Sequence, residues 1–105
     1  MAYDEALAAR IRGLVAGEPN LSEKKMFGGL AFLVGGNMTV AASGQGGLLV
    51  RVDPDQSDEL VRTTAAETMV MRGRAMRGWL RVDAGGDLAD WVARGVGYAR
   101  SLPPK

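Results

Sequence analysis

The residue types in this chain set narrow limits on its chemistry, because it contains neither histidine nor cysteine. Catalytic triads with an imidazole base, cysteine nucleophiles, disulfides and zinc sites built from thiolates or imidazoles are therefore excluded. Carboxylates, lysines, arginines and hydroxyl groups remain. No hydroxyl side chain stands beside a residue that we interpret as an activating base. We predict no catalytic residue, no metal site and no cofactor. A pocket that uses a carboxylate, Lys24 or Lys25 is the remaining enzymatic or small-molecule hypothesis.

The strongest local pattern is a basic stretch late in the chain that carries one tryptophan. No acidic residue lies between positions 68 and 82, and the stretch contains Arg72, Arg74, Arg77, Trp79 and Arg81. In an extended strand Arg77, Trp79 and Arg81 share one face. Cations beside an aromatic ring are typical of surfaces that bind nucleic acid, with phosphates on arginine and bases stacked on tryptophan. The alternative is a face on which arginine stems or a partner subunit cover Trp79. We predict that these five residues contact nucleic acid or a partner.

Two further clusters are explained by local structure. One is acidic and consists of Asp53, Asp55, Asp58 and Glu59. Carboxylates can bind Mg²⁺, but these begin a predicted helix, where negative charge is stabilised in any case. The other is a set of glycine-rich stretches: Gly28-Gly29 lies within a predicted strand, and Gly35-Gly36 and Gly44-Gln45-Gly46-Gly47 join strand to strand. A phosphate loop needs a helix after the glycines, so we interpret these stretches as hairpin turns.

Length and charge define the class of protein. The chain has 105 residues and a formal net charge of +1, which indicates one domain over residues 1–105 and no bulk attraction to nucleic acid or acidic membranes. Positions 26 to 50 carry no charge, yet seven glycines interrupt them. Three short strands explain this stretch better than a membrane helix. We find no signal peptide and expect a cytoplasmic protein that does not enter a membrane.

The hydrophobic pattern predicts an α+β fold of two layers, with a five-stranded antiparallel sheet and helices on one face. Residues 22 to 25 are interpreted as a short helical turn or an exposed approach to the sheet. The expected order is α-β-β-β-α-β-β-α, with elements at residues 4–17, 27–34, 38–43, 48–52, 53–63, 67–72, 75–82 and 87–102.

Helix ends and faces follow from individual residues. Asp4, Asp53 and Asp87 are predicted N-caps, and Pro54 follows the second of them. The first helix is expected to turn one apolar stripe inward: Leu7, Ile11, Leu14 and Val15. The last helix contains Gly95 and Gly97, which we attribute to close packing against the sheet.

The first predicted strand is apolar on both faces. Ala31 and Leu33 point to the side of Phe27, and the opposite side is also apolar. With helices on one face, something else must cover the other. We therefore predict a homodimer or an unknown protein partner, with a contact surface formed by Phe27, Leu30, Phe32 and Val34.

Several segments resemble the TfoX (Sxy) N-terminal domain family. They include Lys24-Lys25-Met26-Phe27-Gly28-Gly29-Leu30, Gly36-Asn37-Met38 and Met76-Arg77-Gly78-Trp79, with matching ends at Met1-Ala2-Tyr3-Asp4-Glu5 and Ser101-Leu102-Pro103-Pro104-Lys105. The resemblance implies a secretion-chaperone-like fold of the order given above. It also implies a link to regulation of DNA-uptake competence, where longer members act as transcriptional co-regulators. We expect a stand-alone, non-enzymatic regulatory domain that binds proteins, with a nucleic-acid-binding module as the alternative.

Overall fold

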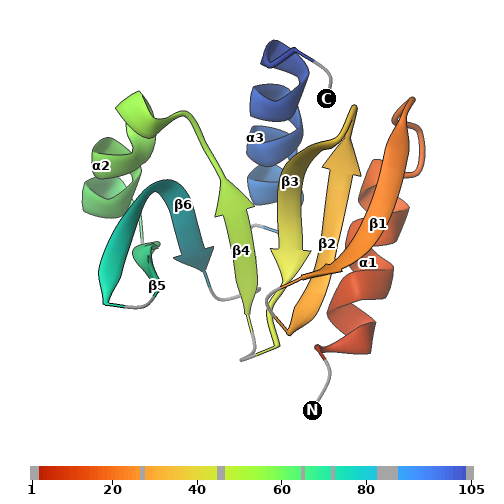
Figure 1. Ribbon diagram of the computed structural model, residues 1–105, viewed down its shortest axis with the longest axis horizontal. Helices are drawn as coiled ribbons and strands as arrows, with labels where there is room; N and C mark the ends of the chain where they lie inside the picture. Colours follow the sequence, from red (N-terminus) through yellow and green to blue (C-terminus); the bar gives the residue numbers. More distant parts are fainter. Residues whose placement is uncertain are drawn as a thin grey trace.

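The computed structural model describes residues 3–26, 28–44, 47–64, 66–71, 73–82 and 88–103. This part of the chain forms an α+β fold with three helices and one antiparallel sheet (Figure 1). In chain order the elements are α1 (Glu5–Val15), β1 (Leu21–Met26), β2 (Gly29–Val34), β3 (Asn37–Ala42), β4 (Leu48–Arg51), α2 (Pro54–Thr63), β5 (Glu67–Met71), β6 (Arg74–Val82) and α3 (Leu88–Ser101).

The sheet has the strand order β1-β2-β3-β4-β6-β5, and every neighbouring pair is antiparallel. All three helices pack on the same face, where their apolar residues join one core with the sheet. α3 lies on β3 and β4, α1 lies beside α3, and α2 covers β6 and β5 (Figure 1). The two-layer prediction is confirmed.

The prediction of five strands is wrong, because residues 22 to 25 belong to a sixth strand, β1. This strand pairs with β2 from Leu21 opposite Val34 to Met26 opposite Gly29. Its middle residues are exposed. Charged residues on an outer strand discourage pairing with other chains. The polarity that argued against a strand therefore fits the outer position of β1.

Helix ends agree with the residues that predicted them. The Asp4 carboxylate accepts hydrogen bonds from the amides of Ala6 and Leu7, at 2.9 and 3.1 Å. The Asp53 carboxylate accepts one from the amide of Asp55 at 2.9 Å, with Pro54 beginning α2. These side chains satisfy amides that have no partner within the helix. Asp87 lies outside the described residues.

The residues predicted as a contact surface are mostly interior. Leu30 and Phe32 are 5% and 0% exposed and belong to the core between sheet and helices. Val34 is 8% exposed, and Phe27 lies outside the described residues. Leu30, Phe32 and Val34 therefore do not form a surface that a second copy could contact while the core stays closed.

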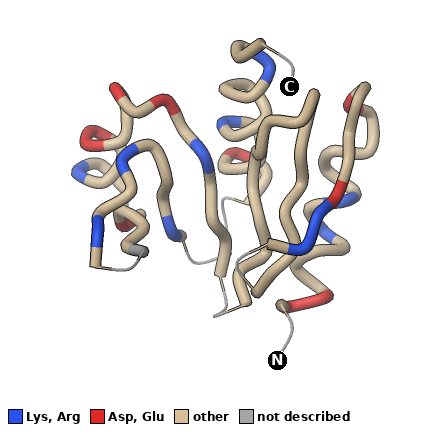
Figure 2. The backbone as a smooth tube through the Cα atoms, in the orientation of Figure 1, with Lys and Arg blue, Asp and Glu red and all other residues tan. Residues whose placement is uncertain are grey.

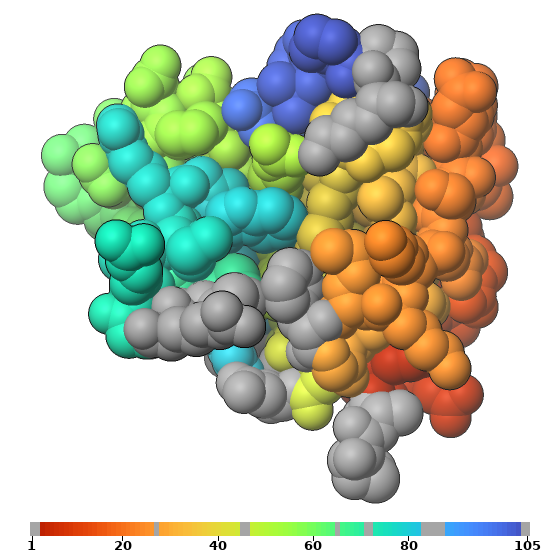
Figure 3. All heavy atoms as spheres, in the orientation of Figure 1, coloured from red at the N-terminus to blue at the C-terminus, as the bar shows by residue number. Residues whose placement is uncertain are grey.

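The chain itself covers the other face of β2. A second apolar cluster lies there, away from the helices, with four buried residues: Ala31, Met38, Ala41 and Leu49. Partly buried side chains from the two ends of the sheet and from β2 pack on them: Met26, Leu33, Met69 and Trp79. Figure 3 looks onto this face, with β1 to β3 on one side and β5–β6 on the other. An apolar second face therefore does not require a partner, and the homodimer stays a prediction.

The two glycines within α3 have different surroundings. A Cβ on Gly95 would lie 2.5 Å from the Thr39 carbonyl oxygen, so glycine allows α3 to approach β3. A Cβ on Gly97 would meet no atom within 4 Å. The prediction of close packing against the sheet is therefore confirmed for Gly95 and wrong for Gly97.

The uncharged stretch from position 26 to position 50 supplies β2, β3 and β4. Within the described ranges, no helix has the length and apolar character that a membrane crossing would need.

Candidate functional site

The basic hairpin places its residues on different surfaces. Leu80 and Val82 of β6 lie in the core with the helices. Trp79 and Arg81 pair with Arg51 and Leu49 of β4, and Trp79 packs on the second apolar cluster. The predicted division of β6 into two faces is therefore confirmed for its second half.

Gly78 interrupts that pattern. It adopts a φ of +90°, and the pairing of β5 with β6 shifts so that Met69 opposes Met76 while Thr68 opposes Leu80. A side chain at position 78 would be strained at this φ, and its Cβ would approach Pro54 Cγ to 3.1 Å. The Gly78 carbonyl accepts a hydrogen bond from the Val52 amide at 2.8 Å. This irregularity is built into the contact between β6 and the start of α2.

The predicted site is consequently divided. The Arg77 guanidinium lies 3.8 Å from the Asp55 carboxylate at the start of α2, and both side chains are well exposed. Arg74 is exposed at the beginning of β6, and Arg72 lies outside the described residues. Figure 2 shows acidic residues gathered on α2 and basic residues spread along β6. The structure places Trp79 and Arg81 on the face of the sheet away from the helices, whereas Arg77 contacts Asp55 of α2.

Trp79 instead contacts an arginine that the sequence did not single out. Arg51, the last residue of β4, places its Cζ 5.6 Å from the centre of the Trp79 ring and 5.5 Å from the centre of the Tyr98 ring. Tyr98 belongs to α3, so one guanidinium links the sheet to the helix layer. Such contacts are worth about 0.5–1 kcal/mol each at partly exposed sites.

Arg94 of α3 has a similar environment. Its Cζ lies 5.2 Å from the centre of the Trp91 ring. We call Arg51 and Arg94 the ring-held arginines. Within the described part of the chain, neither of them has a carboxylate partner. Four other arginines do form ion pairs with carboxylates: Arg12, Arg62, Arg77 and Arg100.

Both ring-held arginines border a groove between α2 and α3. Arg94 and Tyr98 are part of its lining, and Arg51 lies over Tyr98. The groove has a volume of about 220 Å³, and its lining comprises Val52, Asp53, Gln56, Leu60, Ala93, Arg94, Gly97 and Tyr98. Sites for drug-sized ligands and cofactors usually occupy about 300–1,000 Å³. This α2–α3 groove is therefore of a size for one or two amino-acid side chains.

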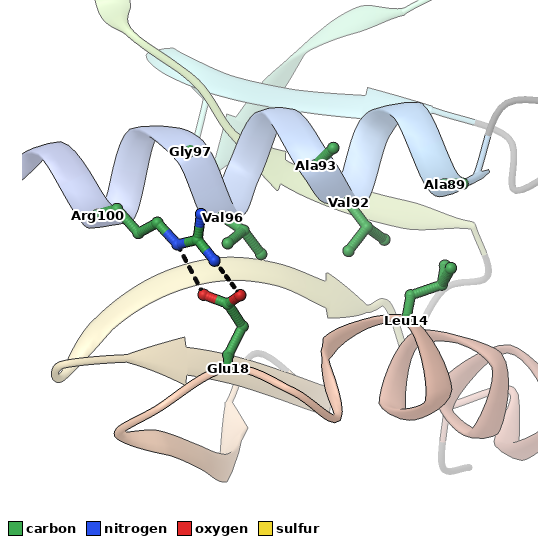
Figure 4. Close-up of a pocket in the computed structure, with 8 residues that line it drawn as sticks. All are labelled: Leu14, Glu18, Ala89, Val92, Ala93, Val96, Gly97 and Arg100. Atoms are coloured by element: carbon green, nitrogen blue, oxygen red, sulfur yellow. Dashed lines mark hydrogen bonds and ion pairs between the residues drawn. The ribbon is translucent and has the colours of Figure 1, made fainter.

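A second groove lies on the opposite side of α3, against the end of α1 (Figure 4). It has a volume of about 240 Å³ and is lined by Leu14, Glu18, Ala89, Val92, Ala93, Val96, Gly97 and Arg100. Arg100 donates to both carboxylate oxygens of Glu18, with Nε 2.8 Å from Oε1. Leu14 is 47% exposed beside this groove, so the prediction that it faces the core is wrong. The core stripe of α1 consists of Leu7, Ala8, Ile11 and Val15.

The clearest electrostatic perturbation lies at the edge of the molecule, away from both grooves. Arg12 of α1 donates two hydrogen bonds to Glu23 of β1, at 2.8 and 2.9 Å. These hydrogen bonds lower the pKa of the Glu23 carboxyl. The pair joins α1 to the outer strand, which is a structural role.

The acidic cluster on α2 behaves as a local feature. Asp53 caps the helix, Asp55 pairs with Arg77, and Glu59 lies 3.2 Å from Arg62. Among the residues that the structure describes, no three metal-binding side chains gather at one point. Their arrangement supports the interpretation of these carboxylates as helix-end charges.

Comparison with known proteins identifies the family. The profile of the TfoX N-terminal domain matches residues 13–99 of the chain. No curated protein and no solved structure gives a significant match. Two of the segments that carry the resemblance owe glycines to the fold, since Gly29 lies against the Ala42 carbonyl and Gly78 against Pro54. The match spans most of the chain, which therefore belongs to the TfoX N-terminal domain family.

Proposed function

We propose that this domain acts by binding another protein chain, without catalytic chemistry of its own, as a cytoplasmic component of a regulatory process. Regulation of DNA-uptake competence is the process that the TfoX family implies. One observation carries the proposal: the α2–α3 groove is bordered by two arginines that rest on aromatic rings and have no carboxylate partner among the described residues.

The ring contacts support binding because they fix the arginines before a partner arrives. A free arginine loses about 2 kcal/mol of rotamer entropy when it is immobilised, and a side chain already held by a ring loses less. The groove supplies apolar walls from Val52, Leu60 and Ala93 next to these cations. Apolar walls beside fixed polar groups are typical of recognition sites, and the volume matches side chains of a partner.

Site-specific photo-crosslinking in the producing cell tests this proposal. A photoreactive amino acid replaces Gln56, which is exposed and lines the α2–α3 groove, and in a control it replaces Arg10, which is exposed on α1. We expect an adduct from position 56 that position 10 does not give. An adduct at twice the 11.1 kDa of the chain identifies a second copy, and another mass identifies a different protein. Equal labelling from both positions, or no adduct, would overturn the proposal.

Nucleic-acid binding is a second candidate function, favoured by one arrangement. Trp79 and Arg81 lie on the face of β6 that points away from the helices, and Arg51, opposite Trp79 at the end of β4, lies over the Trp79 ring. Fluorescence anisotropy with labelled duplex DNA and single-stranded RNA tests it at low and near-physiological salt. If Arg51 and Arg81 engage duplex phosphates, log affinity falls with log salt at a slope of about −1.8. Absence of binding at low salt rejects this candidate.

A further inference from the structure

We infer that the α2–α3 groove recognises a carboxylate, supplied by an aspartate or glutamate side chain that stands beside an apolar residue in the partner protein. The inference rests on the proposed function and adds the chemistry that the groove selects. Three features of the groove carry it: the ring contacts of the two guanidinium groups, their approach to the groove from the sheet and from α3, and the mixture of apolar and acidic residues in the lining.

The first feature is the way in which the two arginines are held. A contact between a guanidinium and an aromatic ring uses the charge of the arginine and leaves its five N–H donors without a carboxylate partner. A carboxylate can accept two parallel hydrogen bonds from one guanidinium. No hydrogen bond from Arg51 or Arg94 to a protein acceptor occurs in the described ranges. Their donors are therefore available to a partner.

The second feature is that the two arginines reach the groove from different layers. Arg51 comes from the sheet and lies over the ring of Tyr98, which lines the groove. Arg94 comes from α3, lies over Trp91 and lines the groove itself. A carboxylate that enters the groove therefore meets positive charge from the sheet and from α3. Two cations at one groove favour an anion more strongly than either does alone.

The third feature separates a carboxylate from a phosphate. Asp53 also lines the groove, and its carboxylate caps α2 by accepting the Asp55 amide. The positive end of the helix offsets part of this charge. Repulsion by Asp53 and attraction by the two arginines both rise with the charge of the ligand, so the higher charge of a phosphate brings no clear advantage, and the apolar part of the lining decides between the two groups. The apolar walls formed by Leu60, Ala93 and Gly97 accept a residue next to the acid.

The two tryptophans of the chain provide a direct measurement, because each one supports one of these arginines. The indole N–H signals of Trp79 and Trp91 are followed by ¹H–¹⁵N NMR during titration with acetyl-Leu-Glu-Leu-amide. The matched peptide acetyl-Leu-Gln-Leu-amide and inorganic phosphate are titrated in parallel. We expect the glutamate peptide to move both signals in a saturable way, and to bind at least tenfold more tightly than the glutamine peptide or phosphate.

Variants locate the effect. Arg51→Gln and Arg94→Gln are each expected to weaken binding of the glutamate peptide about tenfold, while the control Arg10→Gln, at an exposed position of α1, leaves its affinity unchanged. Arg94 is exposed on a helix, so its variant keeps the test valid should Arg51→Gln fail to fold. Equal affinity of the two peptides would overturn carboxylate recognition and leave the proposed function intact. Phosphate binding as tight as the glutamate peptide, or no response to any probe, would also overturn it, whereas crosslinking from position 56 judges protein binding separately.

Discussion

The two grooves beside α3 have similar volumes but differ in how their arginines are held. They share Ala93 and Gly97 as lining residues, and each has arginine at its border. In the α1–α3 groove, Arg100 is neutralised by Glu18, so the cation belongs to the fold. In the α2–α3 groove, Arg94 and Arg51 rest on aromatic rings. Aromatic rings hold a guanidinium without cancelling its charge.

This difference shows that the shape of a groove is a poor guide to its role. Both grooves could accept a small side chain, and the α1–α3 groove is slightly larger. The grooves differ in their arginines. An arginine in an ion pair has its charge balanced and its N–H donors occupied, so it offers little to a partner protein. A ring contact leaves the N–H donors for a third group. The predictions below therefore alter the shared helix first and then the arginines on each side.

The largest expected effect comes from Gly95, the glycine that allows α3 to approach β3. Gly95→Ala places a Cβ 2.5 Å from the Thr39 carbonyl oxygen, so the helix must move. We expect a loss of about 2–3 kcal/mol in the free energy of unfolding. The matched variant Gly97→Ala meets no atom within 4 Å and should stabilise the protein by about 0.5–1 kcal/mol. Urea unfolding of both variants measures this. Equal losses would mean that α3 does not approach β3 as closely as the structure shows.

The next effect concerns the contact between β4 and α3. Arg51→Met removes the guanidinium from the Trp79 and Tyr98 rings but keeps much of the apolar stem. We expect a loss of about 1–2 kcal/mol, the sum of two cation–π contacts. Chemical unfolding measures the loss, with Arg74→Met on the exposed start of β6 as the control. If both variants unfold at the same urea concentration as the wild type, the rings do not hold Arg51.

A smaller change in stability is expected when the arginine of the α1–α3 groove loses its carboxylate partner. Glu18→Gln leaves Arg100 without its carboxylate, at a cost of up to about 1 kcal/mol for this partly exposed pair. The α1–α3 groove then resembles its neighbour in having an unpaired arginine. We expect Glu18→Gln to gain weak binding of acetyl-Leu-Glu-Leu-amide, detected as new shifts of the Val92 and Val96 amide signals. Absence of such shifts would mean that an unpaired arginine is insufficient without an aromatic ring beneath it.

Most of the fold was predictable because local signals agreed with one another. Asp4 and Asp53 began helices as their side chains indicated. β1 was missed because its Ser-Glu-Lys-Lys sequence has no strand pattern, and its structure depends on hydrogen bonds to β2. Leu14 was misplaced because the spacing that puts it near the apolar stripe does not reveal where the stripe ends. The strand structure of β1 depends on its pairing with β2, and the exposure of Leu14 depends on how α1 packs against the rest of the fold.

The candidate site was less predictable, because its contacts join distant parts of the chain. Trp79 attracted attention through its basic neighbours, yet the arginine over its ring is Arg51. Nothing near Arg51 marks it, since Tyr98 stands 47 positions away and reaches it only after α3 packs on the sheet. The positive φ of Gly78, which separates Arg77 from Trp79, was likewise hidden in a sequence that reads as a regular strand. Periodicity gives the faces of ideal strands and cannot show such an interruption.

The smallest effect is a difference in pH dependence between the two sides of the molecule. The pKa of Glu23 is lower in the folded than in the unfolded protein because Arg12 donates hydrogen bonds to its carboxylate. The pair therefore contributes its full stability above the ordinary glutamate pKa of about 4.3 and loses it as the pH falls through the lowered value. The difference in unfolding free energy between wild type and Glu23→Gln should thus be largest near neutral pH and vanish in acid. Arg94 lies over Trp91, which has no group that titrates in acid, and forms no ion pair with Asp53 of the same groove, so the difference caused by Arg94→Gln should change much less between pH 7 and pH 3. Urea unfolding across this range measures both differences, and parallel curves for the two variants would contradict the contrast between ion-paired and ring-held arginines.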